Sequence, residues 1–200
     1  CRPKRAIQVL KELSNSRSQL SEALCDQMKY LDSLKEAQEI TKELCGESAP
    51  FGQAEVLNSN WGSRLFRSLV EVNPQATLDA LVSVFGDYTT EQLLNVGPGR
   101  RNIIWSLEKL CFRRRLFDKG IYLMYAFAMA ENERTSNNAT AQFLQFFQVI
   151  LSGTEANLKQ RFKVIENVLN MPGKGSRNLA FFAMSTGLKA TGFFRMGGAE

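Results

Sequence analysis

The sequence predicts an all-α protein made of stacked antiparallel helix pairs, an α-solenoid superhelical fragment. Apolar residues recur at three- and four-residue steps through most of the chain, which is the spacing of one helix face. Capping residues and glycine or proline stops divide this pattern into segments of three or four turns. Each segment leaves an apolar stripe that a neighbouring helix must cover, so successive helices are expected to pack antiparallel.

Residues 100–151 carry the clearest helical pattern. The spacing predicts one helix over residues 100–114, a second over 117–128 and a third over 139–151. The apolar face of the third consists of Phe143, Phe146, Phe147, Ile150 and Leu151. Trp105 and the three phenylalanines lie on apolar stripes, so these aromatic side chains are expected in the core rather than at a ligand site.

Two segments precede this region. A short helix is expected over residues 1–13. Residues 16–45 contain no glycine or proline, and three arrangements fit them. One is a long amphipathic helix, and another is a pair of shorter helices in which Ser33 and Glu36 form a capping box. A dimeric coiled coil is the least favoured, because either heptad register places polar residues in its seam.

Local capping signals mark the helices between the first segment and the centre. Residues 47–60 are expected to be a break with at most one short helical turn. Asn73 and Pro74 combine an N-cap side chain with a proline at the first helical position. Thr89 and Gln92 have the spacing of a capping box.

Two further helices are expected after the centre. Gly153 is predicted to end one helix while Thr154 caps the next. The inner face of that next helix is predicted to be Leu158, Phe162, Ile165, Val168 and Leu169. Residues 171–175 are expected to be a loop, and a final helix starts near residue 179 and is weakened by glycines further on. No strict sequence period survives, which favours a degenerate helical repeat.

Part of the chain resembles a helical region of very large bacterial proteins, some of them similar to the signal-transducing STAND-type NTPases of antiviral defence. The resemblance covers residues 65–154. It is carried by Phe66-x-x-Leu69-Val70-x-x-Asn73-Pro74, Trp105-x-Leu107-Glu108-x-Leu110, Ala130-Glu131-Asn132-Glu133, Ser136-Asn137-Asn138-Ala139-Thr140 and Leu151-Ser152-Gly153-Thr154. It implies a HEAT-like or TPR-like recognition arm and supplies no catalytic residues.

The domain organisation follows from these patterns. Residues 1–60 are expected to be an N-terminal helical segment with a long amphipathic helix, and residues 61–200 a helical repeat region truncated at its C-terminal end. The first residue is Cys1, and the last residues lack a closing element, so we expect a piece of a longer polypeptide.

Composition excludes several kinds of chemistry. The chain has no histidine, which excludes Ser/His/Asp and Cys/His nucleophile systems and His-ligated metals. Its four cysteines show no CxxC spacing, which fits a reduced cytoplasmic compartment. The longest apolar run, residues 121–130, is about half of what a bilayer requires. We therefore expect no catalytic residue, no cofactor, no metal and no membrane partner.

Charge is divided unevenly along the chain. Residues 1–99 hold 10 Lys or Arg against 13 Asp or Glu, and residues 100–200 hold 15 against 7, so the halves carry −3 and +8. The candidate contacts to an anion or nucleic acid are Arg100, Arg101, Arg113, Arg114 and Arg115, with Lys159, Arg161 and Lys163 as helpers. The competing interpretation is a solvated edge with Asp118 and Glu108 as local partners, and we favour it because the aromatic residues fit the core.

Three weaker motifs have ordinary structural explanations. The sequence Gly97-Pro98-Gly99 can offer amides to an anion but more often forms a turn before a helix. Residues 171–176 lack the first glycine of a phosphate loop. Glu131 and Glu133 fit a helix end running into solvent, and Asn137 and Asn138 fit capping and turn positions.

These observations predict a non-enzymatic helical-repeat scaffold or protein-recognition arm of a larger bacterial protein, with a protein as its partner. The alternative is a polyanion or nucleic-acid binding module that uses the basic second half.

Overall fold

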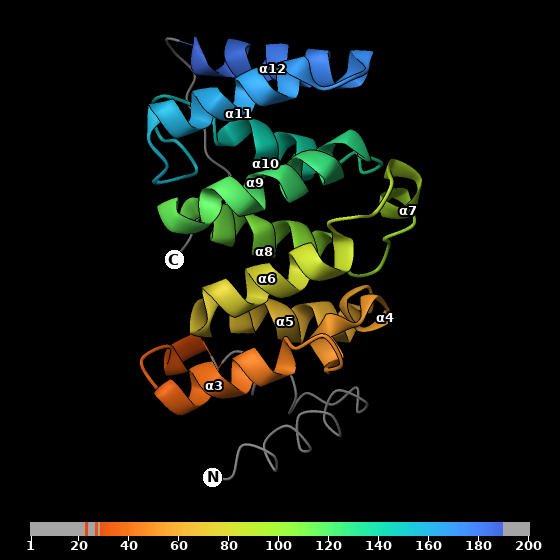
Figure 1. Cartoon of the computed structure of the whole chain (residues 1–200), viewed down its shortest axis with the longest axis vertical. Coiled ribbons are helices and arrows are strands. Elements are labelled where there is room, and N and C mark those ends of the chain that lie inside the picture. Colours follow the sequence, from red (N-terminus) through yellow and green to blue (C-terminus); the bar gives the residue numbers. More distant parts are fainter. Residues whose placement is uncertain (1–22, 24–26, 28, 190–200) are drawn as a thin grey trace. The chain divides into compact units, whose positions relative to one another are not determined.

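The computed structural model describes residues 23, 27 and 29–189, and over these residues it is helical and contains no strand. The all-α prediction is confirmed. The chain divides into two compact units, the first made of Cys1–Tyr88 and Asn95–Ser106 and the second of Thr89–Leu94 and Leu107–Glu200. Their helices are labelled in Figure 1. None of the helices over these described residues is both long enough and apolar enough to cross a bilayer.

The first unit is built from five α-helices and two 3₁₀ turns within its described part. Its elements are η1 (Lys29–Leu31), α3 (Lys35–Leu44), η2 (Pro50–Gly52), α4 (Ala54–Leu57), α5 (Asn60–Val72), α6 (Pro74–Phe85) and the first part of α8 (Arg100–Phe112). Its core contains Phe51, Phe66 and Phe85, each at most 2% exposed, and the rings of Phe51 and Phe66 meet edge to face.

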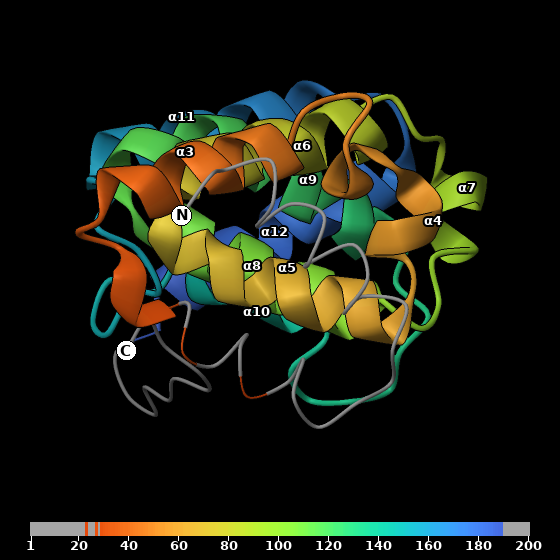
Figure 2. The same cartoon turned by 90° about the horizontal axis from the view of Figure 1, so that it is seen from below.

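In the first unit, α3 lies beside α6 and α5 lies beside the start of α8. Helix α3 lies beside α6 (Figure 2), and the Nδ2 of Asn73, at the start of α6, donates to the backbone oxygen of Gln38 on α3 at 3.0 Å. On the other side, the Nδ2 of Asn102 on α8 donates to the Oγ of Ser63 on α5 at 3.0 Å. One turn further along both helices, the guanidinium of Arg67 lies 4.6 Å from the centre of the Trp105 ring. From the first contact to the second, the residue number rises on both helices. Helix α5 therefore runs parallel to this part of α8.

The second unit consists mainly of two helix hairpins. Its elements are α7 (Thr90–Leu94), the rest of α8, α9 (Arg114–Met129), α10 (Ala139–Gln145), α11 (Leu158–Asn170) and α12 (Lys174–Gly187). Helix α9 packs on α10, and α11 packs on α12 (Figure 1). Phe117, Phe127, Phe143 and Phe146 fill the core between them, each at most 1% exposed.

The two hairpins of the second unit stack in the same orientation. The Nε2 of Gln160 on α11 donates to the Oδ2 of Asp118 on α9 at 3.2 Å. About two turns further along α11, the Nδ2 of Asn167 donates to the Oη of Tyr122 on α9 at 2.6 Å. From the first bond to the second, the bonded residue moves toward the C-terminal end of both helices. Helices α9 and α11 are therefore parallel neighbours. Helix α10 likewise packs against α12.

The predicted helix starts at Asn73 and Thr89 are confirmed. The Oδ1 of Asn73 accepts the amide N–H of Ala76 at 3.1 Å, and Pro74 is the first residue of α6. The amide of Thr89 donates to the Oε1 of Gln92 at 2.8 Å, and the amide of Gln92 donates to the Oγ1 of Thr89 at 3.3 Å. These reciprocal bonds satisfy amides that the first helical turn leaves without a backbone partner.

The single long helix expected over residues 16–45 is wrong. Residues 29–31 form a 3₁₀ turn, residues 32–34 are not helical, and α3 begins only at Lys35. This break also removes the uninterrupted helix that a coiled coil requires. Of the alternative pair of shorter helices, α3 is the one that the described residues cover, and its predicted capping box is absent, because Leu34 is the N-cap and no side chain caps α3. The helix expected over residues 1–13 lies outside the described residues.

The break over residues 47–60 is more ordered than expected. It contains η2 and α4, so it has two short helical turns where at most one was predicted.

The helix expected over residues 139–151 is too long. Helix α10 ends at Gln145, and the backbone oxygen of Gln145 then accepts the amide of Gly153 at 3.3 Å. Leu151 adopts a φ of 56°, which a helix cannot contain. Ile150 and Leu151 are 53% and 57% exposed rather than core residues.

The start and the inner face of α11 also differ from the prediction. Asn157, not Thr154, is the N-cap, and it forms a capping box with Gln160. The helix is rotated so that Arg161 is buried while Leu158 and Phe162 are 43% and 60% exposed. The following loop is shorter than expected, because α12 begins at Lys174.

Candidate interaction surfaces

The structure separates the five arginines that the sequence grouped. Arg100 and Arg101 belong to the first unit and Arg113–Arg115 to the second. The side chain of Arg100 is only 1% exposed, and its amide donates to the backbone oxygen of Gly97 in the turn before α8. A ligand outside the protein cannot reach a guanidinium buried to this degree. Arg100 is therefore removed from the candidate contacts, and Arg101 is exposed.

The turn before α8 is explained by packing. A Cβ on Gly99 would lie 2.1 Å from the backbone oxygen of Leu57, so only glycine lets these two backbone segments approach this closely. The amide of Gly97 donates to the Oδ1 of Asn58 at 2.9 Å. These contacts support the turn interpretation of Gly97–Gly99 over an anion site.

Arg113–Arg115 form an exposed corner at the start of α9, as predicted. Arg114 is tied to the segment before α11: its amide donates to the Oε2 of Glu155 and its Nε to the Oε1 of Gln160, each at 3.3 Å. This use of Arg114 is structural, because it joins the corner to the start of the next hairpin. Contact of this corner with a polyanion stays a prediction.

Arg161 is a structural residue and not a surface contact. It is 7% exposed, and its Nη1 donates to the backbone oxygen of Gln148 at 2.7 Å and of Phe146 at 3.2 Å. Burial lowers the pKa of its guanidinium below the ordinary value for arginine. The burial of Arg161 could not be predicted from the sequence, because an arginine two residues from a lysine gives no signal of burial.

Glu131 also organises backbone. Its Oε1 accepts the amides of Asn132 and Glu133 at 3.0 and 2.9 Å, and its Oε2 accepts the amide of Thr140 at 3.1 Å. The Oδ1 of Asn138 accepts the amide of Ala141 at 2.9 Å and caps α10, as expected of a capping residue. These contacts explain the acidic and amide residues of this loop without a ligand. Among the described residues, no group of three or more Cys, Asp or Glu side chains is arranged to hold a metal ion.

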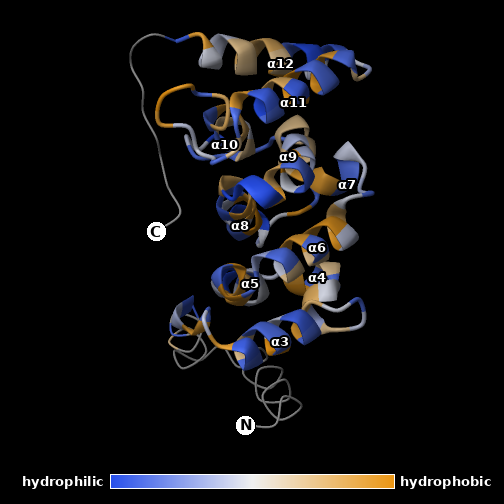
Figure 3. Cartoon of the chain, turned by 60° about the vertical axis from the view of Figure 1, so that its left-hand side comes forward, coloured by the Kyte–Doolittle hydropathy of each residue, from blue (hydrophilic) through white to orange (hydrophobic). Residues whose placement is uncertain are grey.

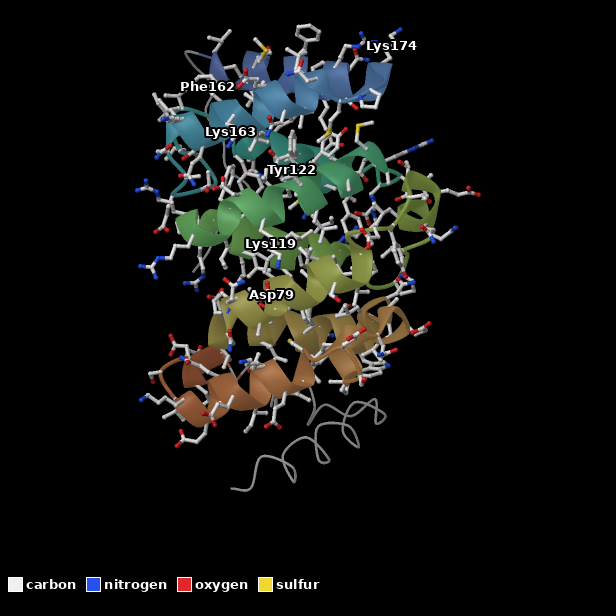
Figure 4. All side chains as sticks on the ribbon, in the orientation of Figure 1. Asp79, Lys119, Tyr122, Phe162, Lys163 and Lys174 are labelled. Atoms are coloured by element: carbon white, nitrogen blue, oxygen red, sulfur yellow. The ribbon has the colours of Figure 1, made fainter. Side chains whose placement is uncertain are left out.

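One candidate surface lies on the outer side of α9 and α11. It comprises Lys119 and Tyr122 on α9 and Phe162 and Lys163 on α11, which Figure 4 shows in the order Phe162, Lys163, Tyr122 and Lys119 from top to bottom. Phe162 is 60% exposed, and the bond from Asn167 to the Oη of Tyr122 fixes the tyrosine ring at this surface. We call these four residues the α9–α11 surface. It combines cations with an exposed aromatic ring, which the sequence analysis had placed in the core.

A second candidate surface lies on α12. Phe181, Met184 and Leu188 are 57%, 39% and 82% exposed, and Lys174 and Arg177 are also exposed. These five positions recur at steps of three and four residues, so they form one stripe, which we call the α12 seam. Figure 3 shows that α12 is hydrophilic near its start and more hydrophobic toward its end. Helix α12 contains no acidic residue.

No protein-family model matches this chain, and no curated protein or solved structure is similar enough to count as a match. Function is therefore inferred from these surfaces and from the packing of the helices.

Proposed function

We propose that this chain is a non-enzymatic helical-repeat scaffold that binds a protein partner, as the recognition arm of a larger cytoplasmic bacterial protein. The observation that carries the proposal is the exposed apolar stripe of α12. Phe181, Phe182 and Leu188 are each more than half exposed on a helix whose other side packs on α10 and α11. Contiguous exposed apolar residues of this size mark sites of interaction with other proteins.

The helix packing supports the repeat part of the proposal. In the second unit, α9 and α11 are parallel neighbours, and α10 packs against α12. In the first unit, α5 and the start of α8 are parallel as well. Stacking of hairpins in one orientation is the arrangement of α-solenoids, which use their extended surfaces for recognition.

The proposal is tested by capturing partners with the intact chain. The chain is immobilised and exposed to a bacterial lysate with and without nuclease, and the bound proteins are identified by mass spectrometry. We expect one protein to be enriched equally in both conditions. Loss of all bound protein after nuclease treatment would contradict protein recognition.

The α9–α11 surface favours a second candidate function, binding of single-stranded nucleic acid. Such sites pair cations that contact phosphates with aromatic rings on which bases stack. Phe162 supplies an exposed ring next to Lys163 on α11, Lys119 lies on the neighbouring α9, and the described part of the second unit holds 12 Lys and Arg against 7 Asp and Glu. Asp118 and Glu166 lie on the same two helices. Their negative charges reduce the positive potential that Lys119 and Lys163 produce at this surface.

Salt dependence separates the two candidates. The affinity of the chain for a single-stranded oligonucleotide is measured over a salt series. Under the second candidate, Phe162→Ala weakens binding about tenfold, and each lost phosphate contact, Lys119→Ala or Lys163→Ala, reduces the salt slope by about 0.7. Phe181→Ala is the matched control and leaves binding unchanged. A flat salt response would contradict binding of nucleic acid. Full binding after replacement of Arg113–Arg115 by Ala would remove only the predicted arginine contacts.

A further inference from the structure

Helix α12 breaks a local rule of helix design at its start. Lys174 is its first residue and Arg177 its fourth, and no acidic residue occupies the first turn. Positive charge at a helix N-terminus opposes the helix dipole, and acidic residues are preferred there. Residues that violate a local rule without a structural gain are typical of functional positions. Both side chains are exposed, so folding of the helix does not require them.

The seam has the geometry of a helix-pairing face. Its positions 174, 177, 181, 184 and 188 follow the alternating three- and four-residue spacing at which one helix meets another. Its first two positions are cationic and its last three apolar. The opposite side of α12, which includes Leu179, Ala180 and Ala183, is buried in its own unit. The seam is therefore available while α12 stays folded.

We propose that the α12 seam binds an amphipathic helix of a protein partner whose apolar stripe has Asp or Glu residues at one end. The apolar stripe of the partner packs on Phe181, Met184 and Leu188, and its carboxylates pair with Lys174 and Arg177. This inference rests on the proposed function and adds the surface and the chemistry of the partner. Charge complementarity selects the partner and the alignment of the two helices, while the apolar contacts hold them together.

Two other occupants fit the seam less well. In a second copy of the chain, parallel pairing of two α12 helices would bring the cations together, and antiparallel pairing would set the cations against apolar residues. Helix α12 offers no carboxylate in either case. A lipid surface favours helices with cations spread along a polar face beside the apolar face. Here Lys174 and Arg177 stand in line with the apolar residues and at one end only. That arrangement matches a partner with one acidic end.

The test uses two designed helical peptides of about 20 residues, a length at which an isolated helix can form. Both carry leucines at a and d positions. One has glutamates at one end of the stripe and the other has lysines. Binding of each labelled peptide to the full chain is measured by fluorescence anisotropy. We expect the acidic peptide to bind at least about tenfold more tightly than the basic one. Equal binding of both peptides, or of neither, would overturn the proposal.

Variants locate the binding. Phe181→Asp with Met184→Asp is expected to weaken binding of the acidic peptide at least about tenfold. The matched control is Phe162→Asp, the same change at an equally exposed phenylalanine of α11, and it leaves binding unchanged. Lys174→Glu with Arg177→Glu reverses the preference so that the basic peptide binds more tightly. This pair improves the charge at the start of α12, so unfolding cannot account for its effect.

The remaining outcomes separate this inference from the proposed function. Analytical ultracentrifugation measures the oligomeric state. If the unaltered chain is a dimer and Phe181→Asp is a monomer, the seam binds a second copy of the chain. Binding to anionic vesicles that the same variant abolishes would assign it to a lipid surface. Either result overturns the proposal. If the captured protein still binds the Phe181→Asp, Met184→Asp variant fully, the seam is wrong and protein recognition stands. If the unaltered chain captures no protein, the proposed function itself fails.

Discussion

The Nη1 of Arg161 donates to the backbone oxygen of Gln148 at 2.7 Å, from inside the packed part of the second unit. The same atom also donates to the backbone oxygen of Phe146. One buried guanidinium thus holds the chain where it leaves α10 and turns toward α11. The loop residues that follow, Ile150 and Leu151, have little contact of their own.

Replacement of Arg161 is therefore expected to destabilise the second unit. Arg161→Met keeps most of the side-chain volume but removes the donor to the buried carbonyl of Phe146 and the part-buried carbonyl of Gln148. The expected loss in the free energy of unfolding is about 2–4 kcal/mol. Chemical denaturation of the purified variant measures it. Lys163→Met, an exposed change two residues away, should stay within about 0.5 kcal/mol, and equal effects of the two variants would refute the structural role.

Asn73 combines a cap with a bond between helices. Asn73→Ala removes the N-cap of α6 and the Nδ2 bond to Gln38, with an expected cost of about 1–2 kcal/mol. Asn73→Asp keeps the capping oxygen and loses only the donor, so its cost should be smaller. Thermal or urea unfolding compares the two. If Asn73→Asp lowers the free energy of unfolding as much as Asn73→Ala does, the N-cap does not contribute to stability.

The thiol of Cys45 should resist alkylation in the folded protein. Burial, with a smaller effect from Asp79, raises its pKa from 9.0 to about 12. At pH 8 the thiolate fraction is then about a thousandfold lower than in the unfolded chain. Mass spectrometry of peptides after iodoacetamide treatment measures the rate at this site. Burial also raises the pKa of Cys111, which is fully buried, so it should react no faster.

The same shift predicts a dependence of stability on pH. The folded state keeps the proton of Cys45 to a higher pH than the unfolded chain does. The free energy of unfolding should therefore be unaffected by this group below about pH 8 and should fall as the pH rises from 9 toward 12. In Cys45→Ala this contribution is absent. If the free energy of unfolding of the variant falls equally between pH 9 and 12, groups other than Cys45 cause the fall.

Leu151 holds a backbone conformation that a branched side chain disfavours. Its φ is 56°, and its side chain is 57% exposed, so little packing is lost on replacement. Leu151→Asn should raise the free energy of unfolding by a few tenths to about 1 kcal/mol, because asparagine tolerates this region. Ile150→Asn is the control at a position with ordinary φ. An equal rise in the free energy of unfolding at both positions would assign the effect to the better solubility of the polar side chain and not to the backbone conformation of Leu151.

Much of the fold was predictable because local signals and packing agree. The capping residues Asn73 and Thr89 lie where the spacing placed them, and Phe143, Phe146 and Phe147 are buried as expected. The apolar periodicity of α8 and α9 needed only short adjustments of their ends, and the all-α class follows directly from that periodicity.

The errors occurred where tertiary contacts override local pattern. The apolar run through Ile150 and Leu151 continues the helical spacing, but Arg161 and Gly153 bind the carbonyls that would extend α10. Phe162 continues the stripe of α11, yet the helix is rotated to bury Arg161 and Val164 instead. A cation in the core has no signature in a hydrophobic pattern. Phe162 was placed on the inner face of α11 for that reason.

The most direct test of protein recognition through α12 is site-specific photocrosslinking. A photoreactive phenylalanine analogue is placed at position 181 of the intact chain in living bacterial cells, and at position 162 as the comparison. Crosslinked products are then identified by mass spectrometry. The account predicts one protein crosslinked at position 181, through a helix with an acidic end, and no such product at position 162. A product at position 162 that contains nucleic acid, with none at position 181, would contradict it.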